Sequence, residues 1–135
     1  MSPSPEDVVR RFYREIWNER RYEAASELFH PDFSHHGNPG PDAKVNALRG
    51  YHAAFPDITV TVDEVIANDM QAAARFTIVG TDTGGFRGRP PTGNAISSWG
   101  VDFFAFSEGR IVSNWVGVDW LGTLIQLGMV SDPWT

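Results

Sequence analysis

The sequence contains no cysteine. This absence excludes disulfide bonds, thiolate nucleophiles and zinc sites with cysteine ligands, and it is compatible with a reducing compartment. Basic residues are also fewer than acidic ones, with 11 Lys and Arg against 17 Asp and Glu and a net charge of -6. A protein that follows nucleic-acid phosphates normally presents a basic face, so the charge balance argues against that class.

Long hydrophobic runs are missing as well. No segment approaches the roughly 20 apolar residues of a membrane-spanning helix. The first residues, Met1 to Asp7, contain neither the basic nor the apolar region of a signal peptide. The sequence therefore predicts a soluble, cytoplasmic protein without a membrane or nucleic-acid partner. Its 135 residues suffice for one domain, 1–135, with one core and one pocket.

Aromatic residues are abundant, at 13% of the chain with five Trp. Such an excess suits a pocket for a flat apolar ligand, although aromatic cores are the more common explanation.

Helical patterns occupy the first part of the chain. Ser4 and Pro5 are typical of a helix start, and an apolar stripe follows as far as Trp17. A second, short helix is expected over 22–29. A third begins at Pro41-Asp42 and carries Leu48, Tyr51, His52 and Phe55 on one face.

Strand patterns follow. Apolar and polar residues alternate over 58–63, and further strands are expected over about 70–79, 95–106 and 111–121. The segment 80–94 is rich in Gly, Pro and Thr and indicates a long loop. Helices first and strands afterwards predict an α+β fold, with three N-terminal helices packed on one face of a curved antiparallel sheet.

Six motifs in the second half occur in the order and register of a known family. They are Arg75-Phe76-Thr77, the glycine loops 80–84 and 88–93, the hairpin Glu108-Gly109-Arg110-Ile111, Trp115 followed by Asp119, and Gln126-Leu127-Gly128. With weaker matches at Phe33 and His36, the chain resembles the SnoaL-like polyketide cyclases of the nuclear-transport-factor-2-like superfamily. The resemblance implies a conical pocket between sheet and helices, commonly in a homodimer.

The resemblance also implies a reaction. In the cyclases, the residue that matches Asp119 removes a proton from an activated carbon, and an aldol closure follows without metal or cofactor. The position that matches Asp102 is His in some of these enzymes. An anionic carboxylate cannot donate a proton to an enolate oxygen as an imidazolium can, so this departure leaves the reaction open.

Strand periodicity offers a separate test of whether these residues meet. If the hairpin after Ser107 has a two- or four-residue loop, Asp102 pairs with Trp115. Period two then places Asp102, Phe104, Trp115 and Asp119 on one face, with the two carboxylates about 13 Å apart at ~3.3 Å per residue. Trp99 falls on the other face unless Gly100 forms a bulge.

Three further side chains are candidates on their position. A two-residue turn at Asn68-Asp69 would pair Arg75 with Val62 and point it to the apolar side; the alternative is an arginine that reaches solvent. His35 and His36 are neighbours on an expected short strand, so at most one enters the pocket. His52 is interpreted as a hydrogen-bonded core histidine.

The candidate catalytic residues are therefore Asp119, Asp102, His36 and Arg75, and the candidate substrate-binding residues are Trp115, His35, Phe104, Tyr51, Phe33 and Trp99. No metal or cofactor is expected, since the histidines lack the spacing of a zinc helix and no phosphate-binding loop is present. The predicted ligand is a small apolar or aromatic molecule.

Four functions remain open from the sequence: a cyclase or isomerase of polyketide-like carbonyl compounds, a limonene-type epoxide hydrolase, a cofactor-independent hydroxylase, and a non-catalytic binding module. Three ionisable groups around an unfilled apolar cavity would favour an enzyme, whereas a pocket filled by the protein's own Trp side chains would favour a module.

Overall fold

The N-terminal helix begins at a capping box. In the computed structural model, which describes residues 3–135, the backbone N–H of Asp7 donates to Ser4 Oγ at 3.2 Å, and the Asp7 carboxylate accepts from the Ser4 N–H at 3.4 Å. Both bonds satisfy donors that a helix start leaves without partners. The α-helix α1 (Pro5–Arg11) continues directly into a π-helical segment, η1 (Phe12–Asn18).

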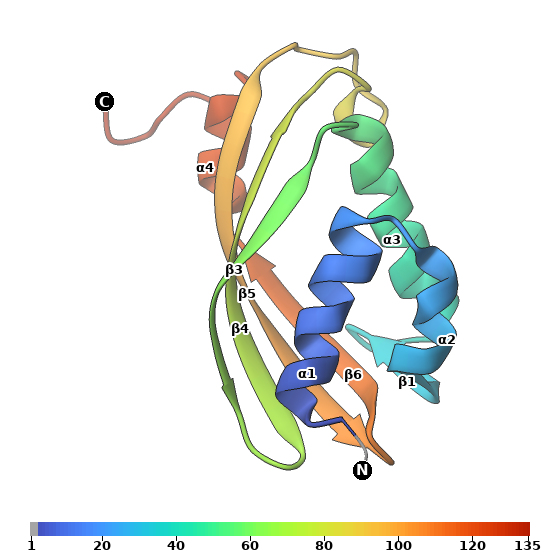
Figure 1. Ribbon diagram of the computed structural model, residues 1–135. Helices are drawn as coiled ribbons and strands as arrows, with labels where there is room; N and C mark the ends of the chain where they lie inside the picture. Colours follow the sequence, from blue (N-terminus) through green and yellow to red (C-terminus); the bar gives the residue numbers. More distant parts are fainter. Residues whose placement is uncertain (1–2) are drawn as a thin grey trace.

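Short elements connect this helix to a longer one. They are η2 (Tyr22–Ala24), α2 (Ala25–Leu28), β1 (Phe29–His35) and β2 (Asn38–Pro39), followed by the 14-residue helix α3 (Pro41–Ala54). The three predicted helical regions are thus present. α3 lies along the concave side of the sheet next to α1 (Figure 1).

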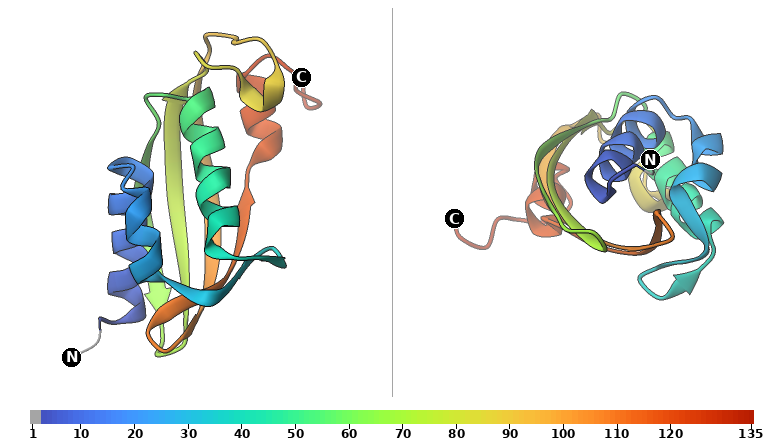
Figure 2. Two further views of the ribbon diagram at one scale, coloured as in Figure 1. Left: turned by 90° about the vertical axis from the view of Figure 1, so that its right-hand side faces the viewer. Right: turned by 60° about the horizontal axis from the view of Figure 1, so that its bottom comes forward.

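The remaining strands form most of the sheet. They are β3 (Thr59–Ala67), β4 (Gln71–Thr81), β5 (Ala95–Ser107) and β6 (Arg110–Val118); the loop between β4 and β5 contains the turn η3 (Phe86–Gly88), and α4 (Trp120–Gln126) follows β6. The six-stranded order is β2-β1-β6-β5-β4-β3. Pairing is antiparallel except between β1 and β6, which run parallel. The sheet curves around the helices (Figure 2), which confirms the predicted α+β fold.

The core between the helices and the sheet is aromatic. Phe12 is fully buried, and its ring makes edge contacts with Tyr13, Phe29 and Phe104 at centroid distances of 5.0, 5.7 and 5.9 Å. Much of the aromatic excess therefore serves the core. Aromatic side chains also surround a cavity, described below.

A β-bulge fixes which side chains of β6 point inward. The hairpin turn at Glu108-Gly109 has two residues with positive φ, 53° and 78°, and it joins the pair Ser107 and Arg110 as predicted. Phe106 then pairs with Ile111, but Ala105 pairs with Ser113, so Val112 is an additional residue on β6. One extra residue reverses the facing of all that follow it in the strand.

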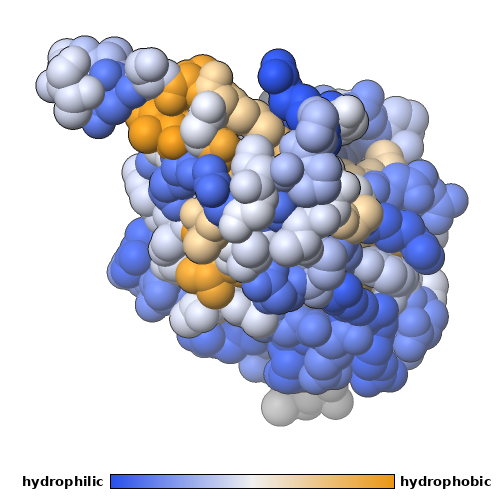
Figure 3. All heavy atoms as spheres, turned by 90° about the horizontal axis from the view of Figure 1, so that it is seen from above, coloured by the Kyte–Doolittle hydropathy of each residue, from blue (hydrophilic) through white to orange (hydrophobic). Residues whose placement is uncertain are grey.

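The convex face of the sheet exposes large apolar side chains. On β5 and β6 they are Trp99 at 56% exposure, Val101 at 40%, Phe103 at 45% and Trp115 at 55%. We call these four residues the outer-face cluster. At the upper end of the molecule, apolar surface also gathers beside the projecting C-terminal segment, while most of the visible face is hydrophilic (Figure 3).

Within residues 3–135, the helices are too short or too polar to cross a membrane.

Candidate active site

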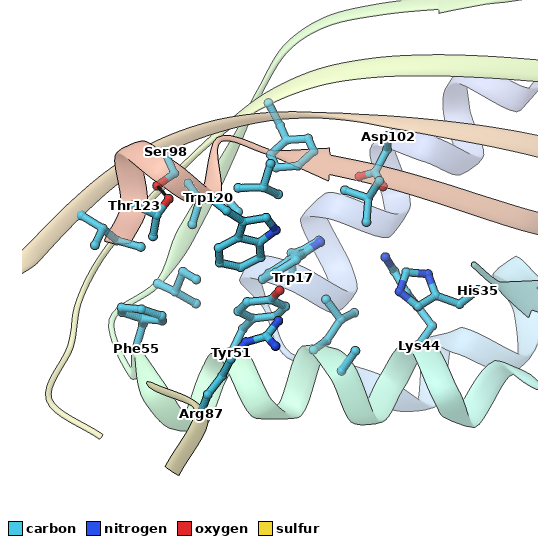
Figure 4. A pocket seen from close by; sticks show the side chains of 18 of the residues that line it. Trp17, His35, Lys44, Tyr51, Phe55, Arg87, Ser98, Asp102, Trp120 and Thr123 are labelled. Atoms are coloured by element: carbon cyan, nitrogen blue, oxygen red, sulfur yellow. Dashed lines mark hydrogen bonds between the residues drawn. The ribbon is translucent and has the colours of Figure 1, made fainter. Parts of the chain in front are cut away.

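A cavity of about 290 Å³ lies between the inner face of the sheet and α3 (Figure 4). Apolar side chains dominate its wall, and six ionisable side chains interrupt them. The apolar and aromatic wall includes Trp17, Leu48, Phe55, Phe76, Val116 and Trp120; the ionisable side chains are His35, His36, Lys44, Tyr51, Arg87 and Asp102. The combination of an apolar wall and a few polar groups is typical of a small-molecule site.

Asp102 is the carboxylate of this cavity. It comes from the middle of β5, is only 2% exposed and points inward (Figure 4). The Tyr13 hydroxyl donates to its Oδ2, and Asn114 Nδ2 donates to its Oδ1 at 2.9 Å. A carboxylate has about four lone-pair sites, so these two bonds orient Asp102 and leave it acceptor capacity toward the cavity.

Lys44 extends from α3 toward Asp102 (Figure 4). The residue is 4% exposed, and its Nζ lies 5.4 Å from the centroid of the Phe12 ring. Among the described residues, Lys44 has neither a hydrogen bond nor an ion pair; Asp102 interacts with it only across the cavity. Burial lowers the pKa of Lys44, and the charge of Asp102 partly opposes that change.

Two adjacent histidines close the same end of the cavity. His35 ends β1, and burial together with the positive charge of Lys44 lowers its pKa to about 4. Its Nδ1 is buried without a hydrogen-bond partner among the described residues. His36 follows with a φ of 49°, and its Nε2 accepts the Val116 N–H at 3.0 Å. Both histidines line the cavity, so the expectation that only one would do so is wrong: the left-handed backbone at His36 ends the strand alternation.

Stacked aromatic rings form the opposite end. Tyr51 of α3 stacks on Trp120 at a centroid distance of 6.1 Å, and Phe86 stacks on Trp120 at 5.6 Å. The Arg87 guanidinium lies 5.5 Å from the Trp120 ring and also lines the cavity. Buried Asp82 holds this part of the 80–94 loop in place by accepting hydrogen bonds from backbone and side-chain donors.

The floor of the cavity depends on a glycine. The Phe76 ring lies directly under Gly100 of β5, where a Cβ would come within 2.6 Å of Phe76 Cζ. Gly100 pairs regularly with Phe76 and Val118 and forms no bulge.

His52 has the structural role that was expected. Its Nε2 donates to the Trp17 carbonyl at 2.8 Å, and its Nδ1 accepts from the Tyr22 hydroxyl. The Trp17 carbonyl lies near the end of η1, where helix carbonyls lack partners within the helix. Burial lowers the pKa of His52, so the neutral ring links η1 to α3.

Asp119 lies outside the cavity wall, whereas the sequence predicts it on the same face as Asp102. Asp119 follows β6 as the N-cap of α4, its Oδ1 accepts the Gly122 N–H at 3.0 Å, and it is not among the cavity-lining residues. Its carboxylate therefore has a local capping role.

The predicted inward placement of Trp115 is wrong because the pairing of β5 with β6 differs from the predicted register. Asp102 pairs with Val116, because the bulge at Val112 shifts β6 by one residue. Asn114, Val116 and Val118 consequently face inward, and Trp115 lies in the outer-face cluster. Trp99 is there as well, since Gly100 forms no bulge.

The remaining predicted residues divide between surface and core. Arg75 is on the outer face, where it approaches Asp63 at 3.6 Å and Glu64 at 3.7 Å; a bulge at Asp63 gives Val62 the partner Phe76 instead. Phe33 and Phe104 are fully buried core residues outside the cavity wall. Tyr51 and Asp102 line the cavity as predicted, together with both His35 and His36.

Comparison with known proteins identifies the family of the chain. A sequence model of the SnoaL-like polyketide cyclases matches residues 7–127, nearly its full length. The chain belongs to this family. The aklanonic acid methyl ester cyclase DnrD of Streptomyces peucetius is 28% identical over 95% of this chain and 91% of its own.

Solved structures of this family agree with the fold. IdmH, a candidate polyketide cyclase of Streptomyces antibioticus, is 29% identical with a TM-score of 0.83, covering 93% of this chain and 99% of its own. AclR, a candidate hydroxylase of Streptomyces galilaeus, is 25% identical with a TM-score of 0.82, covering 94% and 82%.

Sequence reasoning missed three residues of this SnoaL-like site. Lys44 lies four residues before Leu48 and seven before Tyr51, on the apolar stripe of α3, and it is the only lysine in the chain. Its position on this stripe and its uniqueness are both visible in the sequence. Asn114 was assigned to the wrong face by the register error, and Trp17 was placed on a helical stripe without a sign of cavity contact.

Proposed function

We propose that this chain is a cyclase-type enzyme that removes an α-proton from a polyketide-like carbonyl compound, with Asp102 as the general base. The observation that carries the proposal is the buried Asp102 carboxylate, oriented by Tyr13 and Asn114 and facing an apolar cavity. Family membership supports the reaction class.

The proposed reaction begins at Asp102. An Asp102 oxygen takes a proton from a carbon between two carbonyl groups, and the electron pair of that C–H bond forms an enolate. The enolate carbon attacks a second carbonyl of the same molecule, a C–C bond closes the ring, and the resulting alkoxide takes up a proton. A positioned general base typically contributes about 10²–10⁴-fold to such a step.

The other end of the cavity would position the substrate. The flat rings of Tyr51 and Trp120, which both line the cavity, provide a stacking surface for an aromatic or conjugated chain. Arg87 beside them would bind a carboxylate or enolate oxygen at the end of the substrate. The cavity is not filled by Trp side chains, which supports an enzyme over a binding module.

Epoxide hydrolysis receives no support from the site. Hydrolases of the limonene type use an arginine and a carboxylate on the strand that corresponds to β4. Arg75 instead lies on the outer face, bound to Asp63 and Glu64.

Isotope exchange tests the proposal. In deuterated buffer, the wild type is expected to accelerate exchange at the α-carbon of an aromatic β-keto ester such as ethyl benzoylacetate, measured by NMR above the buffer rate. Asp102→Asn should remove the acceleration. Equal rates for the variant and the wild type would overturn the assignment of Asp102.

We also propose that the chain forms a homodimer through the outer-face cluster. Single exposed apolar residues are common on protein surfaces, but these four lie together on one face of the sheet and form an apolar patch. A second copy of the chain presents the same patch, so two copies can cover each other.

A further inference from the structure

The only lysine of this chain is buried in its cavity. Lysine is among the side chains least often buried, and Arg supplies the other ten of the 11 basic residues. Lys44 is therefore the one place where the chain has lysine and not arginine. The residue is 4% exposed, and its side chain faces Asp102.

The surroundings of Lys44 do not explain it as a structural ion pair. A buried ammonium normally has a carboxylate and several acceptors around it. Among the described residues, Lys44 has neither a hydrogen bond nor an ion pair, and its contact with the Phe12 ring is at 5.4 Å. Its nitrogen is therefore available to a molecule in the cavity.

We infer that Lys44 is an amine nucleophile that forms a covalent imine with a carbonyl group of the substrate, a role that rests on the proposed function of the same cavity. Its nitrogen lone pair attacks the carbonyl carbon and gives a carbinolamine. Loss of water with uptake of one proton gives the iminium ion.

Asp102 then acts on the iminium ion. The carboxylate takes the proton from the adjacent carbon, and the C–H electron pair forms an enamine. The enamine carbon attacks the second carbonyl, which closes the ring and restores the iminium ion, and the protonated Asp102 gives its proton to the alkoxide that forms. Addition of water then releases the ketone product and one proton, and returns Lys44 to its free amine.

The protonation state of Lys44 agrees with this role. An ordinary lysine, with a pKa near 10.4, has about 1 in 2,500 of its amines neutral at pH 7. Burial lowers the pKa of Lys44, so a larger fraction is nucleophilic at the same pH. The ionisable groups that line the cavity with it are Asp102, His35, His36, Tyr51 and Arg87. Of these, Asp102 raises the Lys44 pKa.

A 1,3-diketone gives a direct test, because it condenses with an amine to a conjugated enaminone that absorbs in the near ultraviolet. The full chain is incubated with 2,4-pentanedione at pH 7. The expected product gains the mass of one diketone less one water, and peptide mapping places it on Lys44. The chain's α-amine is the internal reference for an ordinary amine.

Three variants separate this inference from the proposed function. Lys44→Arg keeps the charge and Lys44→Met keeps the volume; both should lose the adduct, and their circular dichroism and melting curves report whether they fold. Asp102→Asn should still form the adduct, at least as fast as the wild type, because the charge that raises the Lys44 pKa is gone, while it loses α-proton exchange.

Each failure has its own signature. If the α-amine reacts and Lys44 of the wild type does not, the imine role is overturned, while loss of exchange in Asp102→Asn would still support the proposed function. If Asp102→Asn exchanges protons as fast as the wild type, the proposed function fails whether or not the adduct forms.

Discussion

The two faces of β5 and β6 have different surroundings. The inner face presents Asp102, Val116 and Val118 to the cavity, whereas the outer face exposes Trp99, Phe103 and Trp115 to solvent. Both faces contain aromatic or apolar residues, so hydrophobicity alone does not tell them apart. What separates them is strand register.

A single residue decides that register. With Val112 as the bulge, Asn114 turns inward and donates to Asp102; without it, Trp115 would occupy the inner face instead. The position of Asn114 beside Asp102 therefore depends on this bulge. Bulges commonly occur next to active sites for this reason.

The largest expected effect concerns Asp102 and Asp119, the two carboxylates that the sequence predicts on one face of the sheet. Asp102→Asn should reduce α-proton exchange by about 10²–10⁴-fold, because the general base is lost. Asp119→Asn is the matched control and should keep near wild-type exchange, since Asn also caps helices well. NMR exchange rates of both variants test the contrast, and the opposite ranking would restore Asp119 as the base.

The next comparison uses adjacent phenylalanines on opposite faces. Phe104→Ala should lower the free energy of unfolding by about 3–5 kcal/mol, because it leaves a cavity among Phe12 and Tyr13. Phe103→Ala, at a residue 45% exposed, should cost about 1 kcal/mol or less. Urea denaturation at low protein concentration measures both. Similar losses would mean that the two faces are equally buried in solution.

The inner face should also make stability depend on pH through His35. Its pKa is about 4 in the folded chain and about 6.5 when unfolded, so the unfolded state binds more protons between these values. Stability is then complete above pH 6.5 and falls as the pH drops toward 4, by about 1–3 kcal/mol with allowance for partial exposure. Denaturation of wild type and His35→Asn at pH 7 and 4.5 gives the difference; parallel losses would contradict the assignment.

The smallest effect on the folded monomer is expected at the outer face. Trp115→Lys should change the free energy of unfolding of the monomer by about 0.5 kcal/mol or less, because the side chain is 55% exposed. It should nevertheless weaken self-association, since it places a charge within the outer-face cluster. Light scattering over a concentration series tests this. A wild type that stays monomeric at high concentration would refute the dimer.

The sequence predicted the fold well because its signals are local. The Ser4 cap, the α3 stripe and the two-residue turn at Glu108-Gly109 each depend on neighbours within a few residues. The candidate site was predicted only in part. Asp102, Tyr51 and the two histidines line the cavity, but the facing of Trp115 and Arg75 depended on bulges at Val112 and Asp63, which no local pattern announces.

Lys44 is a different kind of omission. Its position on the α3 stripe and its uniqueness were both visible, yet a lysine at the first turn of a helix is ordinarily a solvated residue. Only the path of β5 over α3, set by contacts distant in sequence, shows that its nitrogen faces Asp102.

The contact between Gly100 and Phe76 has a consequence for substrate range. A methyl group at position 100 would lie 2.6 Å from Phe76 Cζ and 2.7 Å from the Gly117 carbonyl oxygen, so a larger residue there must displace both the ring at the cavity wall and the neighbouring strand. Such a substitution would alter the shape of the cavity without removing any of its ionisable side chains. The size of the cavity and the identity of its ionisable groups can therefore change independently of each other.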